Sequence, residues 1–105
     1  MKNWDNAKTD MLAETLIGIS QKRAMKNFLR DLMTESEIAE LGNRLAAAQM
    51  LTDKVPYTQI IEKTGLSSTT VARISKWLNA GMGGYQSVLH HHAVVKSGMS
   101  QSHRS

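Results

Sequence analysis

A single glycine, Gly65, between two short apolar patterns constrains this chain more than any other feature. Ile60 and Ile61 give a short helix before it an inward face, and Val71 and Ile74 give a second helix a buried edge at i, i+3 spacing. Gly65 stands where the chain must turn with positive φ, a conformation that glycine adopts without steric penalty. The stretch therefore predicts a helix-turn-helix whose second helix fits the major groove of DNA.

The second of these helices is expected to present small polar and basic side chains to the outside. A serine hydroxyl, from Ser67 or Ser68, can cap it by accepting from the unpaired amides of the first turn. Short hydroxyl side chains cannot contact a base with two hydrogen bonds, so they predict readout through water or thymine methyl groups, whereas the cations suit phosphates. The residues expected at DNA are Lys54, Thr58, Ser67, Ser68, Thr69, Thr70, Arg73 and Lys76.

The distribution of charge favours nucleic acid over a plain helical hairpin with a solvated face. Up to Asp53 there are seven Lys or Arg and eight Asp or Glu, whereas from Lys54 onward there are six basic residues and one acidic residue, Glu62. The formal net charge of +4 thus lies in the half that carries the motif. The hairpin remains the alternative, because glycine between two short helices is common.

Length and composition predict one small all-α domain. A chain of 105 residues has a core small enough that pairing with another copy would help to complete it. Helix formers dominate the first 80 residues, one proline interrupts them, and no segment alternates like a strand. The absence of cysteine excludes a disulfide framework. No apolar run approaches the ~20 residues that cross a bilayer, and the start is no signal peptide, so a cytoplasmic protein without membrane contact is expected.

Helical periodicity predicts three core helices before the motif. Two cover residues 5–19 and about 21–32, and the third begins at a capping box formed by Thr34 and Glu37 and ends near residue 53. Glycines at 81, 83 and 84 then break the chain after the motif. The expected organisation is one helical domain over 1–95, with dimerisation helices in 1–53, the helix-turn-helix in 54–80, a last helix in 85–95 and a disordered tail in 96–105.

No residues combine into a convincing catalytic or metal site. His90, His91 and His92 are adjacent, whereas chelation from a helix favours i, i+4 spacing, and no carboxylate or thiol lies nearby. No nucleophile elbow or phosphate-binding loop is present. The sequence predicts a protein that is not an enzyme and holds no metal or resident cofactor, and it leaves the role of the three histidines open.

Two separated segments resemble the Trp repressor family, and within it the Trp-repressor-related branch called YerC/YecD. They are the run from Thr34 to Arg44, which contains Leu41-Gly42-x-Arg44, and the motif up to Arg73. The resemblance covers roughly residues 20–90. It implies six helices in an intertwined homodimer and a role as a DNA-binding transcriptional regulator, by analogy a repressor. That family illustrates major-groove docking and water-mediated readout.

The resemblance also implies an effector pocket for tryptophan, lined by Thr34, Arg44 and Arg73. Guanidinium planes stack on aromatic rings and pair with carboxylates. This chain departs from the family pattern at two positions, because Ile74 replaces a glycine and Trp77 replaces a serine of the pocket. The first removes space and the second removes a hydroxyl partner for the ligand's ammonium. L-tryptophan is therefore not expected to be the effector. Two possibilities stay open: another small molecule acts as the corepressor, or the protein needs no effector.

A function of a different class is a dimeric helical module that binds a protein partner and has lost DNA binding. The residues available for it are Tyr85, Val88 and Leu89 after the glycine-rich break. A protein-docking helix usually presents a large apolar anchor. The exposed positions expected on the second motif helix carry hydroxyl, basic or small side chains instead, which favours DNA.

Overall fold

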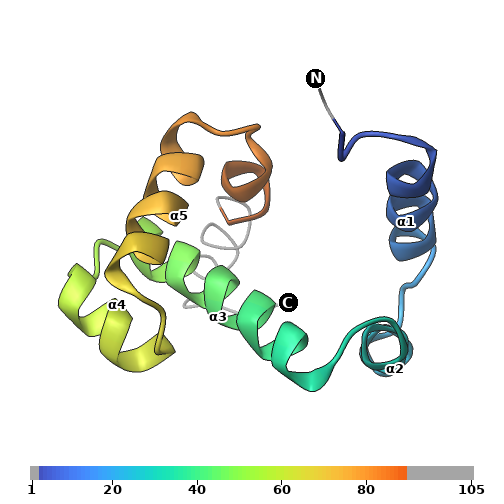
Figure 1. Cartoon of the computed structure of the whole chain (residues 1–105), viewed down its shortest axis with the longest axis horizontal. Helices are drawn as coiled ribbons and strands as arrows, with labels where there is room; N and C mark the ends of the chain where they lie inside the picture. The colour runs from blue at the N-terminus through green and yellow to red at the C-terminus, as the bar shows by residue number, and fades with distance from the viewer. Residues whose placement is uncertain (1–2, 90–105) are drawn as a thin grey trace, which may run out of the picture. The chain divides into compact units, whose positions relative to one another are not determined.

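The chain is all-α, as the sequence predicts. The computed structural model describes residues 3–89, and within that range every regular element is a helix (Figure 1). Residues 84–89 are also helical and match the start of the expected last helix. The rest of that helix, the three histidines and the expected tail lie outside the described residues. The helices are α1 (Ala7–Ile17), α2 (Lys22–Leu32), α3 (Glu35–Thr52), α4 (Tyr57–Thr64) and α5 (Ser68–Ala80).

The chain divides into two compact units, Met1–Ile38 and Ala39–Ser105. In the first, the Asn6 side chain caps α1 by accepting from the amides of Lys8 at 2.9 Å and Thr9 at 3.2 Å. Neither α1 nor α2 contains a buried residue. Ile17, for example, is 82% exposed. Leu16, Met25, Phe28 and Leu29, which repeat at helical spacing on these helices, are only partly buried within the described part of the chain.

The predicted capping box at the start of α3 is present. The Thr34 amide donates to Glu37 Oε1 at 2.9 Å, and the Glu37 amide donates to Thr34 Oγ1 at 3.1 Å. Two otherwise unpaired amides are thereby satisfied, and this fixes the start of the helix. The helix ends at Thr52, close to the expected position.

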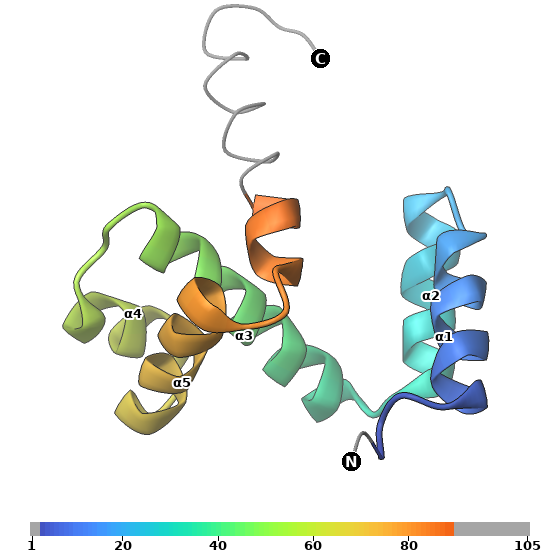
Figure 2. The ribbon, with the colours of Figure 1, turned by 90° about the horizontal axis from the view of Figure 1, so that it is seen from above.

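The core of the second unit lies where α3, α4 and α5 meet (Figure 2). The predicted inward residues Ile60, Val71 and Ile74 have no exposed surface. Two alanines of α3, at positions 47 and 48, are equally buried, and their small side chains allow close helix packing. Leu66 and Leu89 complete the cluster. The predicted burial of Ile60, Val71 and Ile74 is confirmed. The core contacts only one face of α5 and leaves the opposite face exposed.

Candidate nucleic-acid interface

The turn between α4 and α5 has the conformation that the sequence predicts. Gly65 has φ +76°, in the left-handed region, and its amide donates to the Ile61 carbonyl at 2.8 Å. The Thr64 hydroxyl, which is buried, donates to the Ile60 carbonyl at 2.7 Å and accepts from the Leu66 amide at 3.2 Å. This hydroxyl satisfies a buried amide inside the turn and so fixes the direction in which α5 leaves it.

The role of Thr64 was not predicted from the sequence. A threonine directly before a turn glycine can accept a hydrogen bond from the backbone amide two residues later. This Thr-Gly pattern is the sequence signal that could have predicted the role of Thr64. The residue acts on the interface indirectly, through the geometry of the turn.

Ser67 is the N-cap of α5, which settles the choice between two serines for the cap. The Ser67 Oγ accepts from the Thr70 amide at 3.1 Å and donates to the Thr70 hydroxyl at 3.0 Å. Ser68 is the first residue of the helix. Both Ser68 and Thr69 are exposed, whereas Thr70 is half-buried. The hydroxyls with the most freedom to meet a ligand are therefore those of Ser68 and Thr69.

The exposed side of α5 carries polar and basic groups at helical spacing. Thr69, Arg73 and Lys76 follow each other at i, i+4 and i+7, so they lie on one stripe of the helix. All three are exposed, while Val71 and Ile74 on the other side are buried. The stripe thus presents one hydroxyl and two cations to the outside, while the opposite face of α5 is packed in the core.

Two further predicted DNA residues precede this helix. Thr58 lies exposed in the first turn of α4, and Lys54 lies exposed in the loop before it. Tyr57, which is not among the residues predicted to contact DNA, begins α4 and is 42% exposed. Its phenol adds a donor beside the predicted set. Lys54, Thr58, Thr69, Arg73 and Lys76 all belong to the second compact unit.

The residues that the resemblance assigns to an effector pocket are largely engaged elsewhere. The Arg44 Nε atom pairs with Glu40 Oε2 at 3.1 Å, one turn earlier on the same helix. Ile74 is fully buried in the core, and Trp77 is 43% exposed. The Thr34 hydroxyl takes part in the capping box and lies in the first unit. Arg73 and Trp77 are one turn apart on α5 and share a face.

Among residues 3–89, no group of three or more metal-binding side chains comes together. In the same range, no helix combines the length and the apolar character needed to cross a bilayer.

The helices and the surface of α5 define an all-α helix-turn-helix protein. The sequence profile of the family described as "Trp repressor protein" matches residues 7–93. The chain belongs to the Trp repressor family, in its YerC-type branch. This confirms the resemblance found from the sequence.

Three similar proteins agree with that assignment. The uncharacterized protein YerC of Bacillus subtilis (strain 168) is 32% identical over 80 residues, which cover 76% of this chain and 77% of that protein. A TrpR-like protein from Eubacterium eligens ATCC 27750 has a solved structure with a TM-score of 0.82 at 28% identity, covering 89% of this chain and 96% of that one. A second solved structure, from Staphylococcus aureus, gives 0.80 at 26% identity, with 88% and 92% covered.

Proposed function

We propose that the protein is a sequence-specific DNA-binding transcriptional regulator that acts in the cytoplasm, and that its usual effect is repression by blocking access of the polymerase. The observation that carries the proposal is the stripe of Thr69, Arg73 and Lys76 on the exposed side of α5. A hydroxyl next to two cations matches a groove whose walls are phosphates and whose floor is base edges. Membership of the Trp repressor family supports the same class of function.

The regulator is proposed to bind as a homodimer. The two-fold axis of such a dimer brings two copies of α5 to successive major grooves, so the operator is pseudo-palindromic with half-sites about one helical turn apart, ~10 bp. The basic residues Lys54, Arg73 and Lys76 contact phosphates, together with the hydroxyl of Thr58. Affinity then falls steeply with salt, by several units of log K per unit of log salt concentration.

Two substitutions on the stripe separate sequence readout from phosphate binding. We expect Thr69→Ala to reduce the preference for the operator over scrambled DNA, because this short side chain contacts bases through water or methyl groups. We expect Lys76→Ala to weaken binding to all sequences alike and to reduce the salt slope by about 1. Competition binding with scrambled duplexes at several salt concentrations measures both effects.

Lys26→Ala is the matched control, because Lys26 is an exposed lysine of α2 outside the proposed interface. It should leave the salt slope and the preference unchanged. If Lys76→Ala changed the preference and Thr69→Ala only the overall affinity, the two roles would be exchanged.

Regulation by L-tryptophan is not part of the proposal. The Glu40 carboxylate already pairs with Arg44, and Ile74 fills core space next to Arg73. A ligand that leaves polar groups without partners in such a site is rejected. Either another small molecule acts as corepressor or DNA binding needs none.

Calorimetric titration tests this directly. We expect L-tryptophan to give no saturable heat and no increase in affinity for the operator. Glu40→Ala, which releases Arg44, should also fail to bind it, because Ile74 and Trp77 are unchanged. Micromolar binding to the unaltered protein would contradict the expectation, and binding by Glu40→Ala alone would assign the rejection to the Glu40–Arg44 pair.

A further inference from the structure

The exposed side of α5 carries an alanine between its polar residues. Ala72 is exposed, whereas its neighbour Val71 is completely buried. It comes three residues after Thr69 and four before Lys76, so it lies between them on the same side of the helix. Ala72 is not among the residues predicted to contact DNA, but its position is within the proposed interface.

The groups around Ala72 on this side of α5 are hydrophilic. Ser68, one turn earlier, and Lys76, one turn later, are both exposed, and α5 contains no carboxylate. The hydroxyls of Ser67 and Thr70 are engaged with each other at 3.0 Å. The methyl of Ala72 is therefore an apolar group set among hydroxyl and basic groups.

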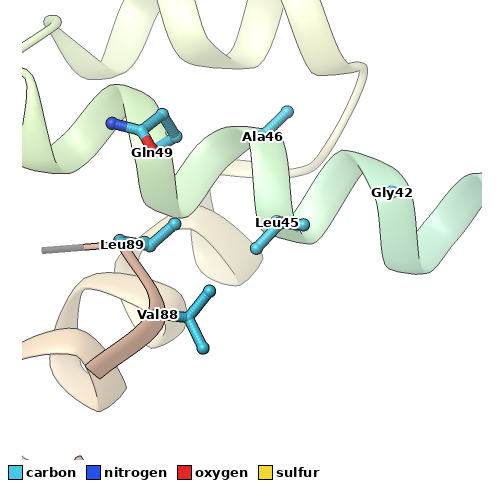
Figure 3. Close-up of a pocket in the computed structure, with 6 residues that line it drawn as sticks. All are labelled: Gly42, Leu45, Ala46, Gln49, Val88 and Leu89. Carbon is cyan, nitrogen blue, oxygen red and sulfur yellow. The ribbon is translucent and has the colours of Figure 1, made fainter. Parts of the chain in front are cut away.

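Ala72 is separate from an apolar pocket in the same compact unit. That pocket, of about 330 Å³, lies between α3 and the helical segment 84–89 (Figure 3). None of the residues that form it belongs to α5. They are Gly42, Leu45, Ala46, Gln49, Val88 and Leu89. The Ala72 methyl is thus no extension of this pocket, and within the described chain it faces solvent.

The place of Ala72 along α5 suits contact with bases. When a helix-turn-helix docks, the N-terminal residues of its second helix meet the base edges, whereas most other contacts go to phosphates. Ala72 lies in the first half of this 13-residue helix, and the cations of Arg73 and Lys76 follow it. A side chain that ends at Cβ also allows the α5 backbone to come close to the floor of the groove.

A methyl group can recognise one kind of group on that floor. The bases present hydrogen-bond donors and acceptors in the major groove, and the apolar group among them is the C5-methyl of thymine. Contact between the two methyl groups removes both from water, whereas cytosine, which has a hydrogen at C5, covers the alanine less well. The partner that fits Ala72 is therefore a thymine.

We propose that Ala72 is a specificity-determining residue, whose methyl group contacts the C5-methyl of one thymine in each operator half-site. The inference rests on the proposed function and names a base that α5 selects. Because a two-fold dimer brings two copies of α5 to the operator, the same thymine is recognised in both half-sites.

The test removes one methyl group from the DNA and one from the protein. Each thymine of the operator selected from a random duplex pool is replaced in turn by deoxyuridine, which lacks only the C5-methyl. We expect one such replacement per half-site to weaken binding of the unaltered protein about threefold to fivefold, as loss of one buried methyl predicts. Ala72→Gly should bind the thymine and deoxyuridine duplexes at that position with equal affinity.

Two further variants control for helix stability and for the neighbouring threonine. Glycine weakens a helix, but glutamine does not, so Ala72→Gln should keep its helical circular dichroism and lose the same discrimination. Its longer side chain should also weaken operator binding roughly tenfold or more, because it holds α5 away from the bases. Thr69→Ser, which removes the other methyl on this side of α5, should keep the thymine preference of the unaltered protein.

The possible results separate this contact from DNA binding itself. A deoxyuridine effect that is present in the unaltered protein and in Thr69→Ser, and absent from both Ala72 variants, supports the proposal. An operator whose binding depends on no thymine methyl, or depends on it equally in Ala72→Gly, overturns it and leaves Ala72 a role in helix stability alone. Loss of the effect in Thr69→Ser, with retention in Ala72→Gly, would assign the thymine to Thr69. If no operator is enriched at all, the proposed function fails first.

Discussion

Replacing Gly81 with alanine lowers the free energy of unfolding by about 1–3 kcal/mol, the usual range for forcing atoms into filled space. A Cβ atom at this position would lie 2.4 Å from the Trp77 carbonyl oxygen and 3.1 Å from its carbon. Both are backbone atoms of α5, so no side chain can rotate away. The Gly81 amide also donates to that oxygen at 2.9 Å, and relief of the clash stretches this bond.

The effect should extend beyond the turn. The segment after Gly81 returns to the core through Leu89, which is 3% exposed, and Gln86 Nε2 donates to the Leu78 carbonyl at 2.7 Å. A displaced turn weakens both contacts. Denaturant titration of Gly81→Ala against Gly84→Ala is the measurement, because a Cβ at Gly84 meets nothing within 4 Å. Equal free energies of unfolding for the two variants would contradict the prediction, because they would show that the turn accommodates the methyl group at no cost in stability.

The second large effect is expected at Ile74. Its side chain is completely buried in the core of the second unit, so Ile74→Ala leaves a cavity and should cost about 2–5 kcal/mol. The same denaturant titration measures it. Met82→Ala is the control, because Met82 is 83% exposed and its truncation should change stability by less than about 0.5 kcal/mol.

The burial of Ile74 is also relevant to whether the protein can bind L-tryptophan as an effector. It occupies the position where the Trp repressor resemblance places a glycine beside the second arginine of the pocket. Ile74 forms part of the core, and the proposal is that its side chain takes up space that the ligand would need. A loss of less than about 1 kcal/mol for Ile74→Ala would mean that this side chain is not needed for packing, and the argument against tryptophan would lose one of its supports.

The motif was predictable from the sequence because local chemistry determines it. The glycine at 65 and the apolar pairs around it require one turn and two buried faces, and both are observed. The capping box at Thr34 and Glu37 was predictable for the same reason, since its hydrogen bonds join residues three apart. The boundaries of α1 and α2 were also close to those expected.

Features that depend on tertiary contacts were not predictable. The core uses Leu66 and Leu89, which no local pattern marked as inward. The pairing of Arg44 with Glu40 was not predicted either, although i, i+4 spacing permits it.

Lys54 shows a further limit of sequence-based prediction. It has φ +66°, a left-handed conformation usually taken by glycine, and no sequence signal marks it. Its amide donates to the Leu51 carbonyl at 3.1 Å, and the Val55 amide donates to the Met50 carbonyl at 2.9 Å. These two bonds form a Schellman motif that closes α3 and holds the lysine in this conformation.

The most direct measurement is selection of bound DNA from a random duplex pool by the purified protein, without effector and at about 150 mM salt, where non-specific binding is weak. We expect enrichment of a pseudo-palindrome with half-sites ~10 bp apart, and loss of that enrichment for an Arg73→Ala, Lys76→Ala double variant. If no sequence is enriched, either without effector or with aromatic metabolites present, the proposed function is contradicted and a protein-binding module becomes the better explanation.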